Sequence, residues 1–204
     1  MDTGWARLGD ALGMPCKSWS RSRGVRGAGP RMVRTAEFLL GLPNLGVADH
    51  ILVEDGNTLL RFAISAIHLC MRLNVAWSLE NPATSDMGIM KSVMKLMRHP
   101  SVTESIIEFC MLQQEPWRKS TRFLSCGLCL PELDCYRCLG GKRGTCKRTG
   151  EPHVVLMGKD EVSGRFLTQI VEPYPFKLCK ILALGYVNGF ARTKARGLAK
   201  AIAA

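Results

Sequence analysis

Apolar stretches separated by polar, glycine-marked or proline-marked breaks divide this chain into predicted helices and strands. The longest helical periodicity covers 47–73, where the apolar residues form one broad face and Gly56 is expected to separate a short first helix from the main one. A methionine-rich stretch predicts a second helix over 86–97, which ends at His99-Pro100. Short apolar runs predict strands at 75–79, 102–109 and 121–125. This alternation of helices and strands predicts an α/β protein with a parallel sheet.

The rest of the pattern predicts four regions. The first, 1–125, is an α/β region that carries the candidate chemistry, and the second, 126–153, is a cysteine-rich insert. The third, 154–187, supplies strands at 154–157 and 165–170 and a helix at 176–184 that complete the sheet. The fourth, 188–204, is a basic, alanine-rich tail expected to form a frayed helix.

The most informative short stretch is NVAWSLENP, at 74–82. It predicts a buried strand that stops at Glu80 and Asn81, because Pro82 keeps the residue before it out of the helical region. Polar side chains at the carboxyl end of a strand lie where open α/β sheets bind their ligands. The stretch therefore marks a candidate binding site, with an ordinary solvated strand end as the alternative.

The charge of the chain favours a polyanionic partner. The 204 residues are 47% hydrophobic and carry a net charge of +11, which indicates nucleic acid, although a solvated basic surface is the alternative. No apolar run reaches the ~20 residues of a membrane span, and MDTGWARLGD lacks the apolar region of a signal peptide. Residues 9–34 are expected to be a mobile cationic segment, in which nearby positive charge would lower the pKa of Cys16. An incidental buried cysteine is the alternative.

Five of the nine cysteines crowd into 126–146, followed by His153. Two Cys-x-x-Cys pairs with a later Cys and His predict a structural zinc site better than a disulfide framework. The favoured ligands are Cys135, Cys138, Cys146 and His153, with Cys126 and Cys129 as competitors. Unrelated buried cysteines are the alternative. This cysteine usage predicts an intracellular, reducing compartment, with the nucleus as one option.

Three segments, in one order along the chain, resemble the cytosine C5-methyltransferases. MPCKSWS is similar to the Pro-Cys loop of that family, and SLENP is similar to its Glu-Asn motif. QQEPWRKSTRFL is similar to its Pro-Gln-x-Arg-x-Arg segment, and VEPYPFKLCKILA resembles its last motif more loosely. The resemblance covers 12–125 and 168–184, and it implies a partial Rossmann-like methyltransferase sheet with the cysteine-rich zinc-binding insert attached.

The resemblance implies a role for each matching residue. Cys16 would add as a thiolate to C6 of cytosine, which makes C5 nucleophilic, and Glu80 would hold the N3 and amino edge of the base. Asn81 would support the geometry of the site, and Lys119 would supply the charge of the third motif. A set of arginines would bind nucleic acid, most simply DNA: Arg21, Arg23, Arg26, Arg118 and Arg122.

The sequence also departs from the family. Trp117 and Thr121 stand where the third motif has Gln and its second Arg, and nothing before Cys16 resembles the Gly-rich turn that binds S-adenosylmethionine. We therefore expect a DNA (cytosine-5) methyltransferase-like domain that is truncated and inactive alone. Its cofactor would be S-adenosylmethionine, and a separate chain carrying the cofactor-binding half would be one partner. The alternative is a non-catalytic, zinc-containing nucleic-acid-binding module.

Overall fold

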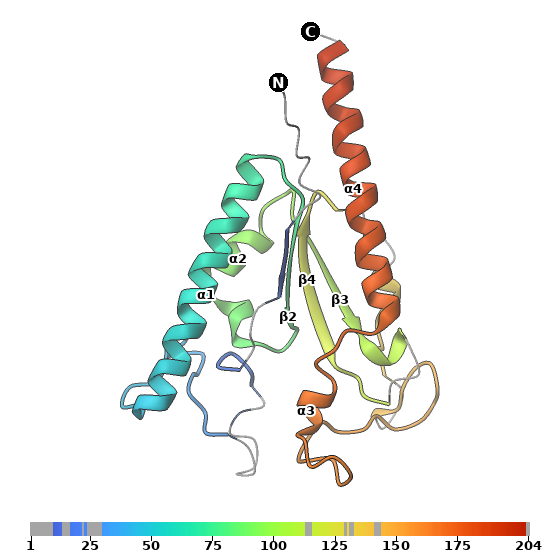
Figure 1. The fold of residues 1–204 in the computed structure, drawn as a ribbon. Coiled ribbons are helices and arrows are strands. Elements are labelled where there is room, and N and C mark those ends of the chain that lie inside the picture. The colour runs from blue at the N-terminus through green and yellow to red at the C-terminus, as the bar shows by residue number, and fades with distance from the viewer. Residues whose placement is uncertain are drawn as a thin grey trace.

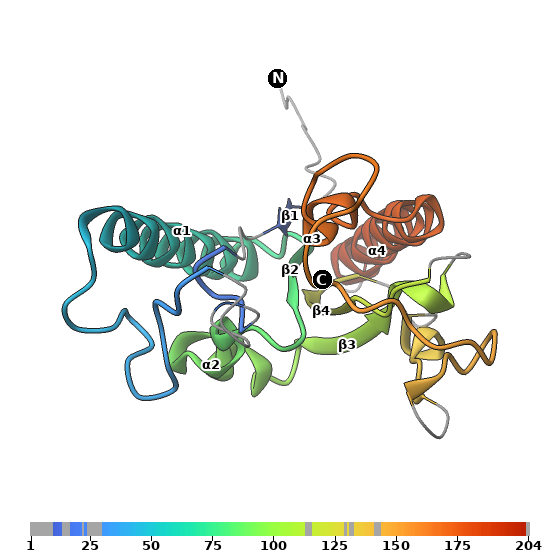
Figure 2. The ribbon, with the colours of Figure 1, turned by 90° about the horizontal axis from the view of Figure 1, so that it is seen from below.

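The computed structural model describes residues 10–13, 17–21, 23, 30–112, 116–128, 130, 133–140 and 144–202. Within them, a four-stranded sheet of order β1-β2-β4-β3 is covered by helices on both faces (Figures 1 and 2). β1 (Asp10–Gly13) pairs parallel with β2 (Trp77–Pro82), whereas β4 (Ser120–Cys126) runs antiparallel to both β2 and β3 (Thr103–Glu108). The carboxyl ends of β1, β2 and β3 therefore share one edge of the sheet. No helix among these residues is both long and apolar enough to cross a membrane.

The α/β class is confirmed, but the sheet is mixed and not parallel. The strand that breaks the parallel pattern is β4, which the chain reaches from β3 through 109–119. The short helix η3 (Phe109–Met111) is the one regular element described in that connection. A parallel pair needs a longer crossover, usually built around a full helix. The chain instead turns back and inserts β4 between β2 and β3.

Glu80, Asn81 and Pro82 lie inside β2, although the sequence predicted that the strand stops before them. The backbone stays in register with β4 through Pro82, which lies opposite Thr121. Proline is tolerated at this terminal position because it removes only one hydrogen-bond donor from the ladder. β1 was not predicted, since four residues, DALG, are too few to show a period of two.

One face of the sheet packs against α1 (Val47–Arg72) and α2 (Lys91–Met97). The buried core of this layer includes Trp19, Leu60, Ile67, Trp77, Leu79, Val93 and Leu124. The predicted helix over 47–73 is confirmed, but Gly56 does not interrupt it. A Cβ at Gly56 would meet Ser18 Oγ and lie 3.0 Å from Arg34 Nη2, so glycine allows the N-terminal segment to approach the helix closely. The second predicted helix is divided, since η2 (Asp86–Ile89) precedes α2 and Met90 between them is extended.

The opposite face packs against α4 (Phe176–Ile202), which follows the short α3 (Leu167–Ile170). The core here contains Ile107, Phe109, Leu112, Phe123, Leu133 and Leu178. The strands expected at 154–157 and 165–170 do not form. In their place the chain makes an isolated bridge between Lys159 and Phe166 and then enters α3. The predicted helix at 176–184 and the basic tail are one continuous helix as far as Ile202.

Candidate functional site

Glu80 points to the α4 side of the sheet. Its neighbour on the same face, Ser78, lies 2.7 Å from the Tyr186 hydroxyl of α4, measured between their side-chain oxygens. Glu80 is half-buried, and its carboxylate is hydrogen-bonded to Tyr174, in the segment between α3 and α4, and lies near Lys119. Three segments distant in sequence therefore meet at this carboxylate.

Burial changes the pKa values of Glu80 and Tyr174. Desolvation raises the pKa of Glu80, and the hydrogen bond from Tyr174 and the charge of Lys119 offset part of that rise. Desolvation also raises the pKa of Tyr174, and the Glu80 carboxylate adds to the effect. Tyr174 therefore stays protonated and donates to Glu80, while Glu80 takes up a proton more readily than an exposed glutamate does.

The ammonium group of Lys119 is held in place by backbone and aromatic contacts. Its Nζ donates to the Val171 carbonyl at 2.7 Å and lies 4.6 Å from the centroid of the Phe109 ring. The Phe109 and Tyr174 rings pack edge to face, with centroids 6.4 Å apart. Lys119, Phe109 and Tyr174 thus pack together beside Glu80.

Asn81 and Thr121 are fully buried on opposite faces of the sheet. Asn81 shares its face with Arg122, its partner in the β2–β4 register, and lines a small hollow there with Met87 and Gly88. Thr121 lies on the Glu80 face, opposite Pro82. Among the described residues, neither side chain has a hydrogen-bond partner. Trp117, the other position matched in the third motif, packs half-buried against the α4-side core.

Cys16 lies outside the described residues, as do Arg26 and Cys129, but both flanks of Cys16 are described. On one side, Gly13 is the register partner of Glu80. On the other, Trp19 is fully buried, and its carbonyl accepts from the Asp86 backbone N–H at 3.0 Å. The described flanks of 14–16 are therefore attached to the sheet and to η2.

Residues 22 and 24–29 of the predicted mobile segment lie outside the described residues, and Arg34 at its end is buried. Arg34 is 3% exposed, and its guanidinium lies 3.5 Å from the centroid of the Trp19 ring. It also donates to Asn57 Oδ1 at 2.8 Å and to the Val53 carbonyl at 2.9 Å, both in α1. Burial lowers the pKa of Arg34 to about 10, and Glu54 and Asp86 partly offset that effect. Arg34 therefore joins the N-terminal segment to α1 through these hydrogen bonds.

The other candidate nucleic-acid contacts form ion pairs with carboxylates. The pairs are Arg21 with Asp86 at 2.6 Å, Arg23 with Asp49 at 3.4 Å, Arg118 with Glu108 at 3.4 Å, and Arg122 with Glu104 at 2.6 Å. Arg122 lies on the sheet face opposite Glu80, because its register partner is Asn81. The structure therefore does not bring Arg122 near the Glu80 carboxylate, whereas it does bring Lys119 near it.

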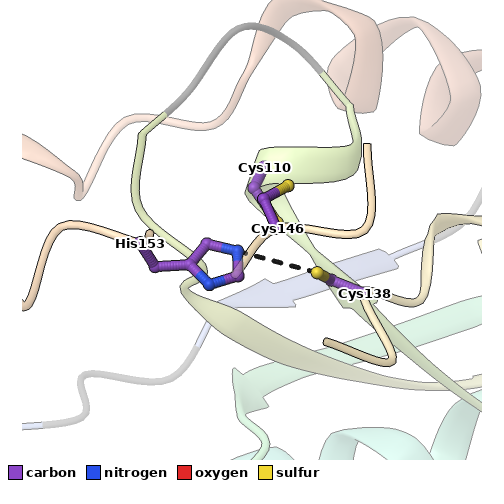
Figure 3. Close-up of side chains that lie close together, drawn as sticks. All are labelled: Cys110, Cys138, Cys146 and His153. Atoms are coloured by element: carbon purple, nitrogen blue, oxygen red, sulfur yellow. Dashed lines mark hydrogen bonds between the residues drawn. The ribbon is translucent and has the colours of Figure 1, made fainter. Parts of the chain in front are cut away.

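A second site gathers three cysteines and a histidine: Cys110, Cys138, Cys146 and His153 (Figure 3). Their ligand atoms all lie within 4.8 Å of one another, and the three cysteines are buried. An ideal tetrahedral zinc site places neighbouring sulfurs about 3.8 Å apart, from Zn–S bonds of about 2.3 Å. The four side chains could therefore hold a metal ion after small movements.

Three of the four favoured ligands are brought together, and Cys110 takes the place expected for Cys135. Cys135 is exposed and stands outside the group of ligand atoms. Cys126 ends β4 and packs against the α1-side core. Spacing could not identify Cys110, because it precedes the insert by a whole strand and meets it only through the fold. The one sequence signal for Cys110 was its position directly after the apolar run at 102–109, which predicts a strand.

The surroundings of the cluster orient its donor atoms. His153 Nδ1 lies 3.0 Å from the Gly144 carbonyl, a contact that places the proton on Nδ1 and leaves Nε2 unprotonated, with its lone pair free to bind a metal ion. Nε2 lies 3.6 Å from Cys138 Sγ, and the Lys147 backbone N–H donates to the same sulfur at 3.4 Å. The contacts from Gly144 and Lys147 are of the kind that orient ligating side chains in metal sites.

The thiols of the cluster differ in acidity. Burial raises the pKa of Cys110 far above its ordinary value, and the neighbouring Cys138 and Cys146 raise it further. Burial also opposes ionisation of Cys146, but hydrogen bonds from the backbone of Thr149 and Arg148 and from the side chains of Thr149 and His153 together outweigh it and lower its pKa to about 6. Cys146 is therefore the thiol that ionises most readily of these two.

The fold and its two sites define an α/β protein with a half-buried carboxylate in an inner strand of the sheet, toward its carboxyl end, and a Cys3His cluster able to hold a metal ion. Comparison of the chain with protein-family models, with curated proteins and with solved structures finds no match. Function must therefore be inferred from the chemistry of the two sites.

Proposed function

We propose that this chain is a DNA (cytosine-5) methyltransferase-like domain, in which Glu80 binds the edge of a flipped cytosine. The observation that carries the proposal is the convergence of Lys119 and Tyr174 on Glu80. These residues come from three separate segments that resemble methyltransferase motifs. A half-buried carboxylate that is hydrogen-bonded to a tyrosine and lies near a lysine is suited to the N3 and amino edge of a pyrimidine.

The chemistry of the proposal begins with Cys16. Its thiolate adds to C6 of cytosine, the C5–C6 π electrons move toward C5, and Glu80 stabilises the charge that develops at N3. The raised pKa of Glu80 favours this role, since a protonated carboxyl can donate to N3. C5 then takes a proton from water. Loss of the original C5 proton and expulsion of the thiolate restore the base.

The family also implies S-adenosylmethionine, but the residues present do not fit it. No described segment is a glycine-rich turn at the end of a strand, the feature that binds this cofactor in the family. We therefore derive no methyl-transfer step for this chain alone. We propose a separate chain carrying the cofactor-binding half as one partner.

Exchange of the cytosine C5 hydrogen tests the proposal without any cofactor. The purified chain, incubated in D2O with an oligonucleotide containing one unpaired cytosine, should place deuterium at C5, as read by mass spectrometry. Cys16→Ala should abolish the exchange, and Cys135→Ala is the matched control that should retain it. Binding of the oligonucleotide with no exchange would overturn the proposal in favour of a non-catalytic nucleic-acid-binding module.

For the Cys3His cluster we propose a structural zinc ion, held by Cys110, Cys138, Cys146 and His153. Three sulfurs and one imidazole suit zinc, and four protein ligands leave no open position for a substrate. Zinc would supply local folding free energy to an insert that is short and rich in glycine and charge. It would also tie that insert to η3, since Cys110 belongs to η3.

Metal analysis tests the zinc assignment. Protein purified without chelators should carry about one zinc per chain. Cys110→Ser should lower this content well below one after dialysis, because it removes a ligand, whereas Cys135→Ser should leave it unchanged. Loss of zinc from the Cys135 variant and not from the Cys110 variant would favour the ligand set expected from the spacing of the insert.

A further inference from the structure

The two sites are joined by three consecutive residues, Glu108, Phe109 and Cys110. Cys110 is one of the four candidate metal ligands. Glu108, 1% exposed, accepts the backbone N–H of Cys138 at 2.7 Å, so it also holds a second ligand in place. The same carboxylate accepts from Ser120 Oγ at 3.1 Å, at the start of β4.

Phe109 faces the other way, toward the Glu80 site. Its ring lies beneath the Lys119 ammonium and packs edge-on against Tyr174. Its backbone N–H donates to the Arg118 carbonyl at 3.0 Å, so the segment that carries Lys119 is attached to η3 by its main chain as well. Lys119 and Tyr174 are the two groups that act on Glu80. A continuous path of contacts therefore runs from Cys110 through Phe109 to Glu80.

We propose that the metal centre positions the Glu80 site through η3, with Phe109 as the positioning residue between them. This inference rests on the proposed zinc site, and on the proposed function only for the base that Glu80 binds. A single 3-10 turn of three residues has too few hydrogen bonds to fix its own orientation. Its orientation must come from its contacts, and metal ligation at Cys110 would add a bond to the packing and main-chain contacts of Phe109.

Hydrogen exchange of the full chain, with zinc bound and after removal by a chelator, tests the inference. Amides in 116–122 and 171–178 should exchange at least about tenfold faster without zinc, because the segments holding Lys119 and Tyr174 lose their support. Amides in 57–70 of α1 should not change, since that helix packs on the other face. The measurement needs no oligonucleotide, so it can succeed or fail independently of the base that Glu80 binds.

Two outcomes would overturn the inference. Faster exchange confined to 133–153 would show that the metal stabilises only its own insert. Faster exchange throughout, α1 included, would show that the metal holds the whole fold and has no particular link to Glu80.

A Phe109→Leu variant separates positioning from metal binding. Leucine keeps an apolar side chain in the core but removes the ring beneath Lys119 and beside Tyr174. With zinc still bound, 116–122 and 171–178 should exchange faster in this variant, while 133–153 remains protected. Unchanged exchange in the first two segments would show that Phe109 does not carry the coupling.

Discussion

At the scale of single residues, the two sites use burial in opposite ways. Around Glu80, burial disfavours the charge, and Tyr174 and Lys119 offset only part of that cost. Around Cys146, backbone donors overcome burial and favour the thiolate. A carboxyl that protonates readily suits hydrogen bonding to a base, and a thiolate suits a metal. The local environments thus distinguish the proposed base-binding group from the proposed metal ligand.

Glu80→Gln should raise stability at neutral pH while it removes activity. The folded pKa of Glu80 is raised above its ordinary value of 4.5, so wild-type stability falls as pH rises from that value through the folded pKa. Glutamine carries no charge to desolvate, so the variant should be the more stable protein in urea unfolding at pH 7.5. Its C5 exchange should fall by about a hundredfold or more.

The acid limit provides the control for this substitution. Well below its ordinary pKa of 4.5 the glutamate is neutral in both folded and unfolded chains, so the two proteins should approach equal stability there. A variant that is less stable than wild type at pH 7.5 would mean that the contacts with Tyr174 and Lys119 outweigh desolvation. The assignment of the raised pKa would then be wrong.

At the scale of elements, the hydrophobic pattern was enough to predict α1 from its helical period and β3 and β4 from short apolar runs. It could not give the direction of β4. Apolar alternation assigns side chains to the two faces of a strand but carries no information about which way its neighbour runs. The direction of β4 follows instead from the connection over 109–119, which is too short for the crossover that a parallel neighbour needs.

The candidate sites divide in the same way. Glu80 and Lys119 could be predicted from short motifs, and the structure places them together. Tyr174 and Cys110 could not, because each becomes a site residue only through tertiary contacts. Tyr174 reaches Glu80 by way of the turn between α3 and α4, and Cys110 reaches Cys146 because the insert folds back onto η3. Spacing finds ligands within one segment and misses those contributed by a distant one.

At the scale of the whole molecule, the chain carries a net charge of +11. Arg21 and Arg23 are paired with Asp86 and Asp49, so these two arginines add nothing to the net positive charge, which comes from other lysines and arginines of the chain. Such a charge favours a polyanion through release of its counterions, and that attraction weakens with salt. Nucleic-acid binding by this chain should therefore be strongly salt-dependent.

The chain by itself should neither bind S-adenosylmethionine tightly nor methylate cytosine. The resemblance provides the half that would hold the base, whereas no described segment offers the glycine-rich turn that would hold the cofactor. Calorimetry with the cofactor should show no tight site, and radiolabelled methyl groups should not reach DNA, even in protein that exchanges the C5 hydrogen. Exchange without methylation is the combination that a base-binding half produces. Methylation by the purified chain, lost in Cys16→Ala and kept in Cys135→Ala, would show instead that the cofactor site is present in a form that its sequence does not reveal.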